Sequence, residues 1–533
     1  MVSYQAPGVY IEEIPSGSRP IELAGTAVAA FVGFTDKGPV GTPVRVTNWT
    51  QYQDTFGGFI RNGYTPLSVY GYFLNGGGNA YVVRVGGDAV SQPATLALPG
   101  AGATQDSLKF TSKLEGSAGN DIKIEIQLEG APAVTAGDGD DEEEEGGSGG
   151  GGDDGGRFRI NISSPGQPAE SFENLTLRRG DARYVVDVVN APETGSIFVE
   201  IEDLAPRGVS VANRTPAAGE QQLAAGSETL TALAPSDFQG DVAARQGIDG
   251  LQVTDDVTMI CIPDLMKAYE DGLLDAEGVV AVQKALLAHC QTMGDRVAIL
   301  DLPPGLDAAG AEAWRAQSNL VSDGGYGALY YPWIKVDDPA SNQTRFIPPS
   351  GYVAGVWART DEKRGVWKAP ANEEVMGPVD IETALTQTEL GVLNVQSVNV
   401  IRSIPGGGIR IWGSRTLAGG ASEWRYVPVR RLFNMVKKSI EGGTQWVPFE
   451  PNDQALWAKV RRDITAVLTR LWAAGAFFGA TASEAFYVKC DSETNPQEVI
   501  DAGIMVCEVG IAPVKPAEFV VFRIQQITPG AED

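Results

Sequence analysis

The sequence has little of the chemistry on which most catalytic and metal sites depend. It holds one histidine and four cysteines in 533 residues. A single histidine is too few for a His-rich metal site, and the cysteines have neither the CxxC spacing of zinc and redox sites nor the density of a secreted disulfide scaffold. The four are Cys261, Cys290, Cys490 and Cys507. This pattern favours a chain made and kept in a reducing cytoplasm.

Positive charge is also scarce. The chain has 41 Lys and Arg against 68 Asp and Glu, a formal net charge of -27 at pH 7. Because binding to a phosphate backbone relies on Lys and Arg, this balance disfavours nucleic acid as a partner. Hydrophobic residues still make up 43% of the chain, which is ordinary for a folded protein. A length of 533 residues favours two to three domains.

Long apolar runs are missing. The most apolar stretches, TAVAAFVGF and VTMICIPDL, are about half as long as the roughly 20 residues that a bilayer-crossing helix needs. The N-terminus has no basic region followed by an apolar run, so it does not resemble a secretory signal. We interpret the apolar stretches as buried strands and expect no direct membrane insertion.

The short motifs that suggest catalysis fail on their context. His289 stands beside Cys290, and adjacent residues of a helix do not face each other as a base and a nucleophile must. The GGSGG match to a nucleophile elbow, Gly146 to Gly150, lies in low-complexity sequence. The glycines of IPGGGIRIWGS favour a hairpin turn, because no GK pair exists to complete a phosphate-binding loop. We expect neither a cofactor nor a metal.

Two acidic residues at strand ends are the reason to consider an enzymatic function as an alternative. Asp264 follows VTMICIP and Asp301 lies in AILDLPPG, positions where α/β enzymes often place catalytic carboxylates. Aspartate beside proline is also common turn and cap chemistry, which the sequence favours here. An α/β hydrolase-like enzyme that uses these two acids remains the alternative.

The order of strand and helix patterns divides the chain. From about residue 250, strands such as VTMICIPD and RVAILDLP alternate with helical stretches, which favours a parallel α/β layer. Short strands separated by Gly and Pro follow Gly86 without a helical period, which favours an inserted, mostly β domain. We predict a mixed α/β multidomain fold. Its parts are an N-terminal arm over 1–25, an α/β middle domain over 26–90 and 236–385, the β insert over 91–235, a C-terminal domain over 386–514 and a C-terminal arm over 515–533.

Three local patterns refine this division. Prolines at 7, 15 and 20 prevent a continuous helix in the N-terminal arm, whose twenty residues could extend about 65 Å at about 3.3 Å each. The segment Gly137 to Gly156 carries nine acidic residues and no basic one, which favours a solvated surface loop over a calcium or partner site. A late amphipathic helix carries an apolar stripe at spacings of three and four. The stripe consists of Trp457, Val460, Ile464, Val467, Leu471 and Trp472.

Both ends of the sequence resemble the tail sheath proteins of contractile phages and of related contractile injection systems. The N-terminal blocks are YQAPGVYIEE, GTAVAAFVGFTDKGP, VTNWTQYQDTFGGF and NGGGNAYVVRV. The later blocks include PPSGYVAGVWARTDEKRGVWKAPAN, IRIWGSRTL, YVPVRRLFNMVKKSIE, LWAAGAFFGATASEAFYVKCDSETNP and GIMVCEVGIAPVKPAEFVVFRIQQ. They appear in the family's order over residues 4 to 90 and 348 to 526, whereas the β insert matches only loosely.

The resemblance implies a structural subunit without catalytic activity. Such a subunit assembles in the cytoplasm with copies of itself as hexameric rings, stacked helically around an inner tube protein as part of a phage tail or phage-tail-like particle. Baseplate and terminal cap proteins would be its other partners. The sheath would contract from a metastable extended state and drive the tube through a target envelope, with the β insert projecting outward. A non-contractile shell subunit is a further alternative.

The resemblance also implies roles for named residues. In this family both arms add strands to sheets of neighbouring subunits, which is β-augmentation used for polymerisation. The strand-donating candidates are Val9, Tyr10 and Ile11, and Phe519, Val520, Val521, Phe522, Arg523 and Ile524. Pairing of these strands within the same chain is the competing interpretation.

A basic cluster stands out in so acidic a chain and could face an acidic inner tube. The candidate tube-facing residues are Arg430, Arg431, Lys437 and Lys438. A solvated helix face is the competing interpretation.

Overall fold

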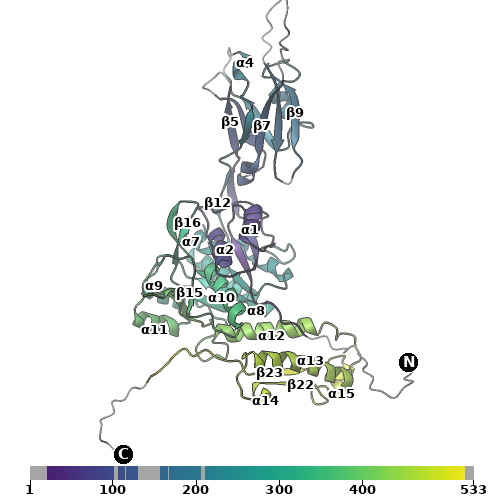
Figure 1. The fold of residues 1–533 in the computed structure, drawn as a ribbon, viewed down its shortest axis with the longest axis vertical. Coiled ribbons are helices and arrows are strands. Elements are labelled where there is room, and N and C mark those ends of the chain that lie inside the picture. Colours follow the sequence, from purple (N-terminus) through teal and green to yellow (C-terminus); the bar gives the residue numbers. More distant parts are fainter. Residues whose placement is uncertain are drawn as a thin grey trace, which may run out of the picture. The chain divides into compact units, whose positions relative to one another are not determined.

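The computed structural model describes residues 21–100, 106–114, 116–129, 156–165, 167–205 and 210–522. The chain divides into a main unit, Met1–Val85 with Ala234–Asp533, and an inserted unit, Gly86–Leu233 (Figure 1). The insert predicted over 91–235 thus begins at 86 and ends at 233 in the structure. Nearly all of the predicted acidic loop 137–156 lies outside the described residues.

A nine-stranded sheet is the centre of the main unit, in the order β18-β21-β20-β15-β14-β13-β1-β3-β2. Its six inner strands pair in parallel, and β2, β21 and β18 add antiparallel edges. The strands are β1 (Val28–Gly33), β2 (Val44–Val46), β3 (Asn79–Arg84), β13 (Met259–Cys261), β14 (Val297–Asp301), β15 (Gly327–Tyr331), β18 (Glu373–Glu374), β20 (Val398–Ile404) and β21 (Gly408–Ile411). The predicted mixed α/β class is confirmed, because alternating strands and helices build this parallel layer.

Helices lie in the connections between the parallel strands, because parallel neighbours cannot be joined by a short hairpin. They are α1 (Trp49–Phe56), α2 (Thr65–Leu74), α5 (Pro235–Gln239), α6 (Gly247–Gly250), η2 (Leu251–Val253), α7 (Asp264–Glu270), α8 (Ala276–Met293), α9 (Ala308–Ser318), α10 (Ser350–Arg364) and α11 (Gln387–Val395). Helices α2 and α10 pack so closely that a Cβ at Gly351 would lie 2.5 Å from Ser68 Cβ. A small second sheet completes this part, with β16 (Ile334–Asp338), β17 (Gln343–Ile347) and β19 (Asp380–Ile381).

The C-terminal part of the main unit is a helical layer that ends in a two-stranded sheet. Its elements are α12 (Val427–Gly443), α13 (Gln454–Ala473), α14 (Ala482–Ala485), β22 (Phe486–Lys489), α15 (Gln497–Asp501) and β23 (Glu508–Ile511). The predicted apolar stripe lies on α13 and packs against Leu432, Met435 and Val436 of α12. The boundary predicted at 386 lies before β20 and β21, which pair into the nine-stranded sheet, and the helical layer begins at α12.

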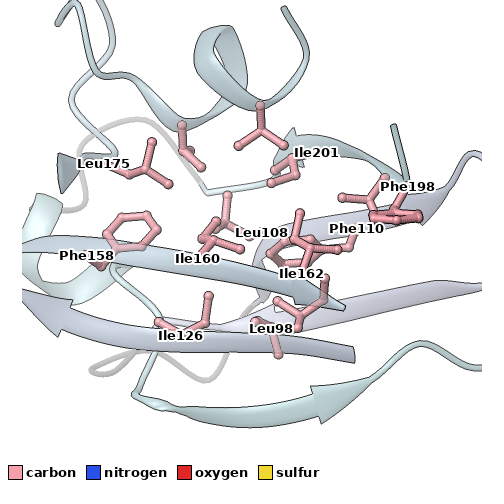
Figure 2. Packing of buried hydrophobic residues seen from close by; sticks show 14 of the residues in the cluster. Leu98, Leu108, Phe110, Ile126, Phe158, Ile160, Ile162, Leu175, Phe198 and Ile201 are labelled. Atoms are coloured by element: carbon pink, nitrogen blue, oxygen red, sulfur yellow. The ribbon is translucent and has the colours of Figure 1, made fainter. Parts of the chain in front are cut away.

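The inserted unit is mostly β structure, built as three small sheets in the orders β10-β6-β5, β11-β7-β8-β9 and β12-β4. Its elements are β4 (Asp88–Gln92), β5 (Thr95–Pro99), β6 (Asp106–Ser112), η1 (Gly116–Asp121), β7 (Lys123–Glu129), β8 (Arg157–Ser163), β9 (Glu170–Leu175), α3 (Val185–Val189), β10 (Val199–Asp203), α4 (Val211–Arg214), β11 (Gly219–Gln222) and β12 (Ser227–Ala232). Burial alternates along the whole of β8, in which Phe158, Ile160 and Ile162 are buried and the residues between them are not. Figure 2 shows these three residues packed with Leu98, Leu108 and Phe110 in one core.

We predict that Phe158→Ala destabilises the inserted unit by about 3 to 5 kcal/mol, because it removes a fully buried ring and leaves a cavity. All ten tryptophans lie outside residues 86–233, so tryptophan fluorescence follows the main unit only. Urea unfolding followed by far-UV circular dichroism should show the reduced stability of the inserted unit. The urea midpoint measured by tryptophan fluorescence should stay unchanged. Leu128→Ala is the control, since Leu128 on β7 is 55% exposed. An equal loss in both variants would contradict the assigned core.

Candidate functional site

Asp264, the first acidic candidate, has a structural role at the start of α7. Its carboxylate is fully buried and accepts hydrogen bonds from the backbone N–H groups of Phe34, at 2.6 Å, and Thr65, at 3.2 Å. The Tyr64 N–H donates to it as well. Burial raises the pKa of Asp264, and these hydrogen bonds oppose the shift. The carboxylate therefore joins the end of β1 to the first turn of α2.

Asp301 has the same kind of role at the end of β14. Its Oδ1 accepts the backbone N–H of Ser350 at 2.9 Å and so caps α10. Burial raises the pKa of Asp301 to about 7, against the opposing effect of the Ser350 hydrogen bond. Both acids thus make the cap and turn contacts that the sequence favoured.

His289 is buried on α8 and is neutral at pH 7. Burial and the charge of Arg296 lower its pKa to about 4, and its Nδ1 lies 3.7 Å from Asp249 Oδ1. Among the described residues, no group of three or more His, Cys, Asp or Glu side chains could hold a metal ion. The described helices also include none that is long and apolar enough to cross a membrane.

The root of the N-terminal arm, residues 21–26, is fixed to the helical layer. The candidates Val9, Tyr10 and Ile11 lie outside the described residues. Ile21 is 2% exposed and belongs to the core between α12 and α13. The Ala24 N–H donates to Ser439 Oγ at 2.9 Å, and Arg470 donates to the Ile21 carbonyl. These contacts hold the root against both helices.

Arg431 completes this attachment and is buried in doing so. Its guanidinium forms a bidentate ion pair with Asp361 of α10, in which the two side chains are 3% and 5% exposed. The same group donates to the Thr26 carbonyl at 2.9 Å and lies over the Trp357 ring, 4.7 Å from its centroid. One arginine therefore joins α10, α12 and the N-terminal arm root.

Arg430 is also used inside the chain. Its Nε donates to Asn434 Oδ1 at 2.9 Å, and the guanidinium lies 4.0 Å from the centroid of the Trp424 ring. Arg430 and Arg431 are only 4% and 3% exposed and have partners within the chain. A tube-facing role for these two residues stays a prediction. The ion-pair partner of Arg431, Asp361, is 70 residues away, so charge density alone did not reveal it.

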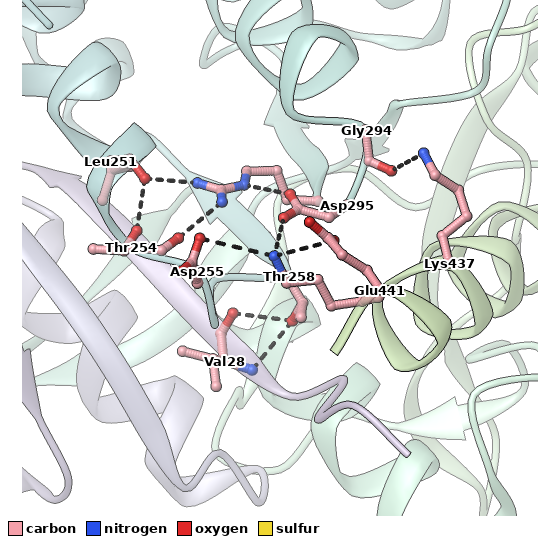
Figure 3. Close-up of polar contacts among 11 residues, drawn as sticks. Val28, Leu251, Thr254, Asp255, Thr258, Gly294, Asp295, Lys437 and Glu441 are labelled. Atoms are coloured by element: carbon pink, nitrogen blue, oxygen red, sulfur yellow. Dashed lines mark hydrogen bonds and ion pairs between the residues drawn. The ribbon is translucent and has the colours of Figure 1, made fainter. Parts of the chain in front are cut away.

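The two lysines of the cluster bind the turn between α8 and β14, and Figure 3 shows Lys437 reaching Gly294 of this turn. Lys437 Nζ donates to the Gly294 carbonyl at 2.9 Å. Lys438 Nζ lies 3.4 Å from Asp295, and Asp255 and Glu441 each approach it at 3.8 Å. Lys437 remains exposed and Lys438 partly exposed, so a tube-facing role for these two residues stays a prediction.

The root of the C-terminal arm is attached through Glu518, which the sequence analysis did not single out. Its carboxylate accepts two hydrogen bonds from Arg415, through Nε and Nη2, each 2.7 Å long. Asn394, Arg425 and Tyr426 donate to it at 3.1, 3.4 and 3.2 Å. Burial would raise the pKa of Glu518, but the hydrogen bonds from Arg415 and Asn394 prevail and lower it.

Four exposed apolar residues follow this anchor and pair with no strand that the structure describes. Phe519, Val520, Val521 and Phe522 are 73%, 70%, 79% and 84% exposed and belong to no strand. Arg523 and Ile524 lie outside the described residues. A run of exposed apolar residues on one segment is unusual for a folded surface and marks a contact site.

The small sheet of β22 and β23 stands just before this arm. The two strands pair from Phe486 with Ile511 to Lys489 with Glu508. The sheet has no third strand among the described residues. The edge of such a sheet is a template for pairing with another strand. A two-stranded sheet is marginally stable by itself, and added strands stabilise it.

The fold is that of contractile sheath subunits. The contracted PVC sheath complex of an extracellular contractile injection system superposes with a TM-score of 0.57 at 24% identity, over 99% of both chains. The helical sheath of the anti-feeding prophage in the contracted state gives a TM-score of 0.54 at 24% identity, over 98% of this chain and 100% of that one.

Sequence comparisons identify the family. The phage tail sheath protein central domain matches residues 249–417, and the phage tail sheath C-terminal domain matches residues 421–527. A tail sheath protein of Burkholderia phage BcepMu is 23% identical over 97% of this chain and 96% of its own length. One from Vibrio phage KVP40 is 27% identical over 40% of this chain and 30% of its own length. The chain belongs to the tail sheath protein family of contractile systems.

We predict that Asp301 makes the stability of the main unit depend on pH. Its pKa is about 7 in the folded chain and about 3.9 in an unfolded one, so the folded state holds the extra proton between these values. Relative to that of Asp301→Asn, the free energy of unfolding of the wild type should fall by up to about 4 kcal/mol as the pH rises from about 4 to about 7. Above about pH 7 it should fall no further.

Urea unfolding followed by tryptophan fluorescence at pH 5, 6, 7 and 8 measures this difference. Asp337→Asn, which changes an exposed aspartate, is the matched control and should run parallel to the wild type. A constant gap between the wild type and Asp301→Asn across this range would show that Asp301 does not titrate as described.

A second prediction concerns the arm anchor. Arg415→Met should free the Glu518 carboxylate, which then becomes available to a glutamate-specific protease. Hydrogen bonds to charged groups each contribute about 1.5 to 3 kcal/mol, so release of the peptide that begins at Phe519 should accelerate roughly tenfold or more. Mass spectrometry of a digestion time course measures it. Arg402→Met is the control, because Arg402 lies over the Trp412 ring. Equal rates in both variants would remove Arg415 as the anchor.

Proposed function

We propose that this chain is the structural subunit of a contractile sheath. Copies of it assemble as hexameric rings stacked helically around an inner tube, and the sheath contracts from a metastable extended state to drive the tube through a target envelope. The observation that carries the proposal is the exposed apolar segment Phe519–Phe522 directly after the Glu518 anchor. The β22–β23 sheet, which has no third strand among the described residues, is the candidate acceptor for such a segment from another copy. The proposal assigns the chain no catalytic role and needs no cofactor.

The linkage between subunits would be strand addition. The C-terminal arm of one copy pairs with an open edge of the β22–β23 sheet in a neighbour, and the N-terminal arm with its Val9–Ile11 strand adds a second link. Five new backbone hydrogen bonds at a net of about 0.5 to 1.5 kcal/mol each, with burial of the arm's apolar side chains, give several kcal/mol per link. Links of this strength hold while the rings rearrange.

The anchors explain how a link can transmit motion. Glu518 fixes the C-terminal arm root to Arg415 beside the nine-stranded sheet, and Arg431 and Ser439 fix the N-terminal root to α12. Each arm therefore leaves a rigid body at a defined point. Pro513 and Pro516 lie in the segment between β23 and the anchor. This segment can act as a hinge that absorbs a change in backbone direction.

The energy for contraction would be stored in packing. A sheath assembled in one arrangement of its rigid bodies and linked by strands can reach a second arrangement of lower free energy without any hydrolysis step. In this proposal the partners are the chain itself, an inner tube protein, a baseplate and terminal cap proteins. Assembly takes place in the cytoplasm, within a phage tail or phage-tail-like particle.

A non-contractile shell is the competing proposal, and electron microscopy distinguishes the two. A contractile sheath gives long narrow particles and short wide ones, whereas a fixed shell gives filaments of a single diameter and helical pitch.

We predict that the double substitution Val520→Pro with Phe522→Pro abolishes tubular assembly. Proline lacks the N–H that a donated strand supplies to its acceptor, so two prolines disrupt the ladder. The matched control, Val520→Thr with Phe522→Thr, lowers hydrophobicity at the same positions and keeps both N–H groups, and it should still assemble. Sedimentation and negative-stain microscopy of the purified chain measure the outcome. Normal tubes from the proline variant would refute strand donation by the C-terminal arm.

A further inference from the structure

Two cysteines face each other across the small sheet that precedes the C-terminal arm. The pairing of β22 with β23 runs from Phe486 opposite Ile511 to Lys489 opposite Glu508. The next opposed position in this antiparallel register joins Cys490 and Cys507. Their side chains interact, and both thiols are free.

The hydrogen-bond pattern of the sheet defines the geometry of this position. The Ala512 N–H donates to the Ala485 carbonyl at 2.8 Å, so these two residues form a hydrogen-bonded pair. Hydrogen-bonded and non-hydrogen-bonded pairs alternate along an antiparallel ladder, which makes Cys490 and Cys507 a non-hydrogen-bonded pair. Their Cα atoms should therefore lie about 4.5 Å apart, with the side chains at their closest. This separation lies within the range of roughly 4.4 to 6.8 Å that disulfides span.

Exposure separates Cys507 from the other three cysteines. Cys261 and Cys290 are fully buried, at 0% exposure. Cys507 is partly exposed, and all the other cysteines are buried. A soluble oxidant therefore reaches Cys507 first, and Cys490 lies directly behind it as the resolving thiol.

We propose that Cys490 and Cys507 are a site of disulfide formation that closes when the protein meets an oxidising disulfide such as oxidised glutathione. The Cys507 thiolate attacks one sulfur of oxidised glutathione, forms a mixed disulfide and releases one reduced glutathione. The Cys490 thiolate then attacks Cys507 Sγ, forms the Cys490–Cys507 bond and releases the second. Two protons leave the protein thiols, and the two electrons reduce the glutathione disulfide.

The environment of the pair keeps it reduced under ordinary conditions. Burial and the neighbouring Cys490 raise the pKa of Cys507 to about 12, and burial raises the pKa of Cys490. Few thiolates are present at neutral pH, so exchange is slow in a reducing compartment and accelerates at higher pH or with longer exposure to an oxidant.

A bond at this position would change the mechanics of the arm. It would close the loop over residues 491–506 and tie β23 covalently to β22, next to the start of the arm. Peeling of β23 from its neighbour would then require a reductant. The inference goes beyond the sheath function and does not depend on it, because the bond forms within one chain.

Treatment of the purified full chain with oxidised glutathione at pH 8.5 tests the proposal. Digestion after glutamate places Cys490 and Cys507 on different peptides, since Glu493 and Glu498 lie between them. Mass spectrometry without reduction should show these two peptides joined, with two of the four thiols lost in a titration of the denatured protein. Dithiothreitol should restore both thiols, and Cys490→Ser should stop the reaction at a glutathione adduct on Cys507.

Other results would overturn it. Four remaining thiols after prolonged treatment, a stable glutathione adduct on Cys507 of the wild type, or bonds that join Cys507 to another chain would each refute an intrachain site. Tryptophan fluorescence of the untreated Cys490→Ser and Cys507→Ser variants confirms that the main unit is folded, so a folding defect cannot imitate a negative result.

Discussion

The buried guanidinium of Arg431 is the contact that unites the main unit. It joins the carboxylate of Asp361 on α10, the carbonyl of Thr26 and the face of Trp357. Taking one partner out of such a buried pair leaves an uncompensated charge, which typically costs about 3 to 5 kcal/mol. The N-terminal arm therefore begins at a contact whose loss would strongly destabilise the main unit. The same contact joins α10, which packs on the parallel sheet, to the helical layer.

The C-terminal arm has a similar but more exposed anchor. Arg415 and Glu518 make a bidentate pair whose carboxylate side is 20% exposed, so it is more accessible to solvent than the Arg431 pair. Both arms thus start from arginine contacts, one deeply buried and one near the surface. In a sheath whose links persist while its rings move, rigid attachment at the roots and freedom beyond them are the two properties that an arm needs.

Local patterns in the sequence predicted the elements, whereas contacts between distant residues required the structure. The buried residues of β14 and of the α13 stripe each lie close together in the sequence. Both elements are where the patterns placed them. The acidic partners of Arg431 and Arg415 lie 70 and 103 residues away, so neither ion pair could be predicted from local spacing. Sheet pairing likewise required the structure, since only the pairing shows that β20 and β21, which follow residue 386, belong to the nine-stranded sheet.

The inserted unit begins and ends on neighbouring strands. β4 follows its first residues, β12 precedes its last, and the two pair antiparallel from Asp88 opposite Ala232 to Gln92 opposite Ser227. Both polypeptide connections to the main unit are therefore brought to one place by a two-stranded stem. Such a stem is a suitable site for domain insertion, because a foreign domain whose two termini lie side by side can replace the inserted unit there. The nine-stranded sheet would keep all of its own strands.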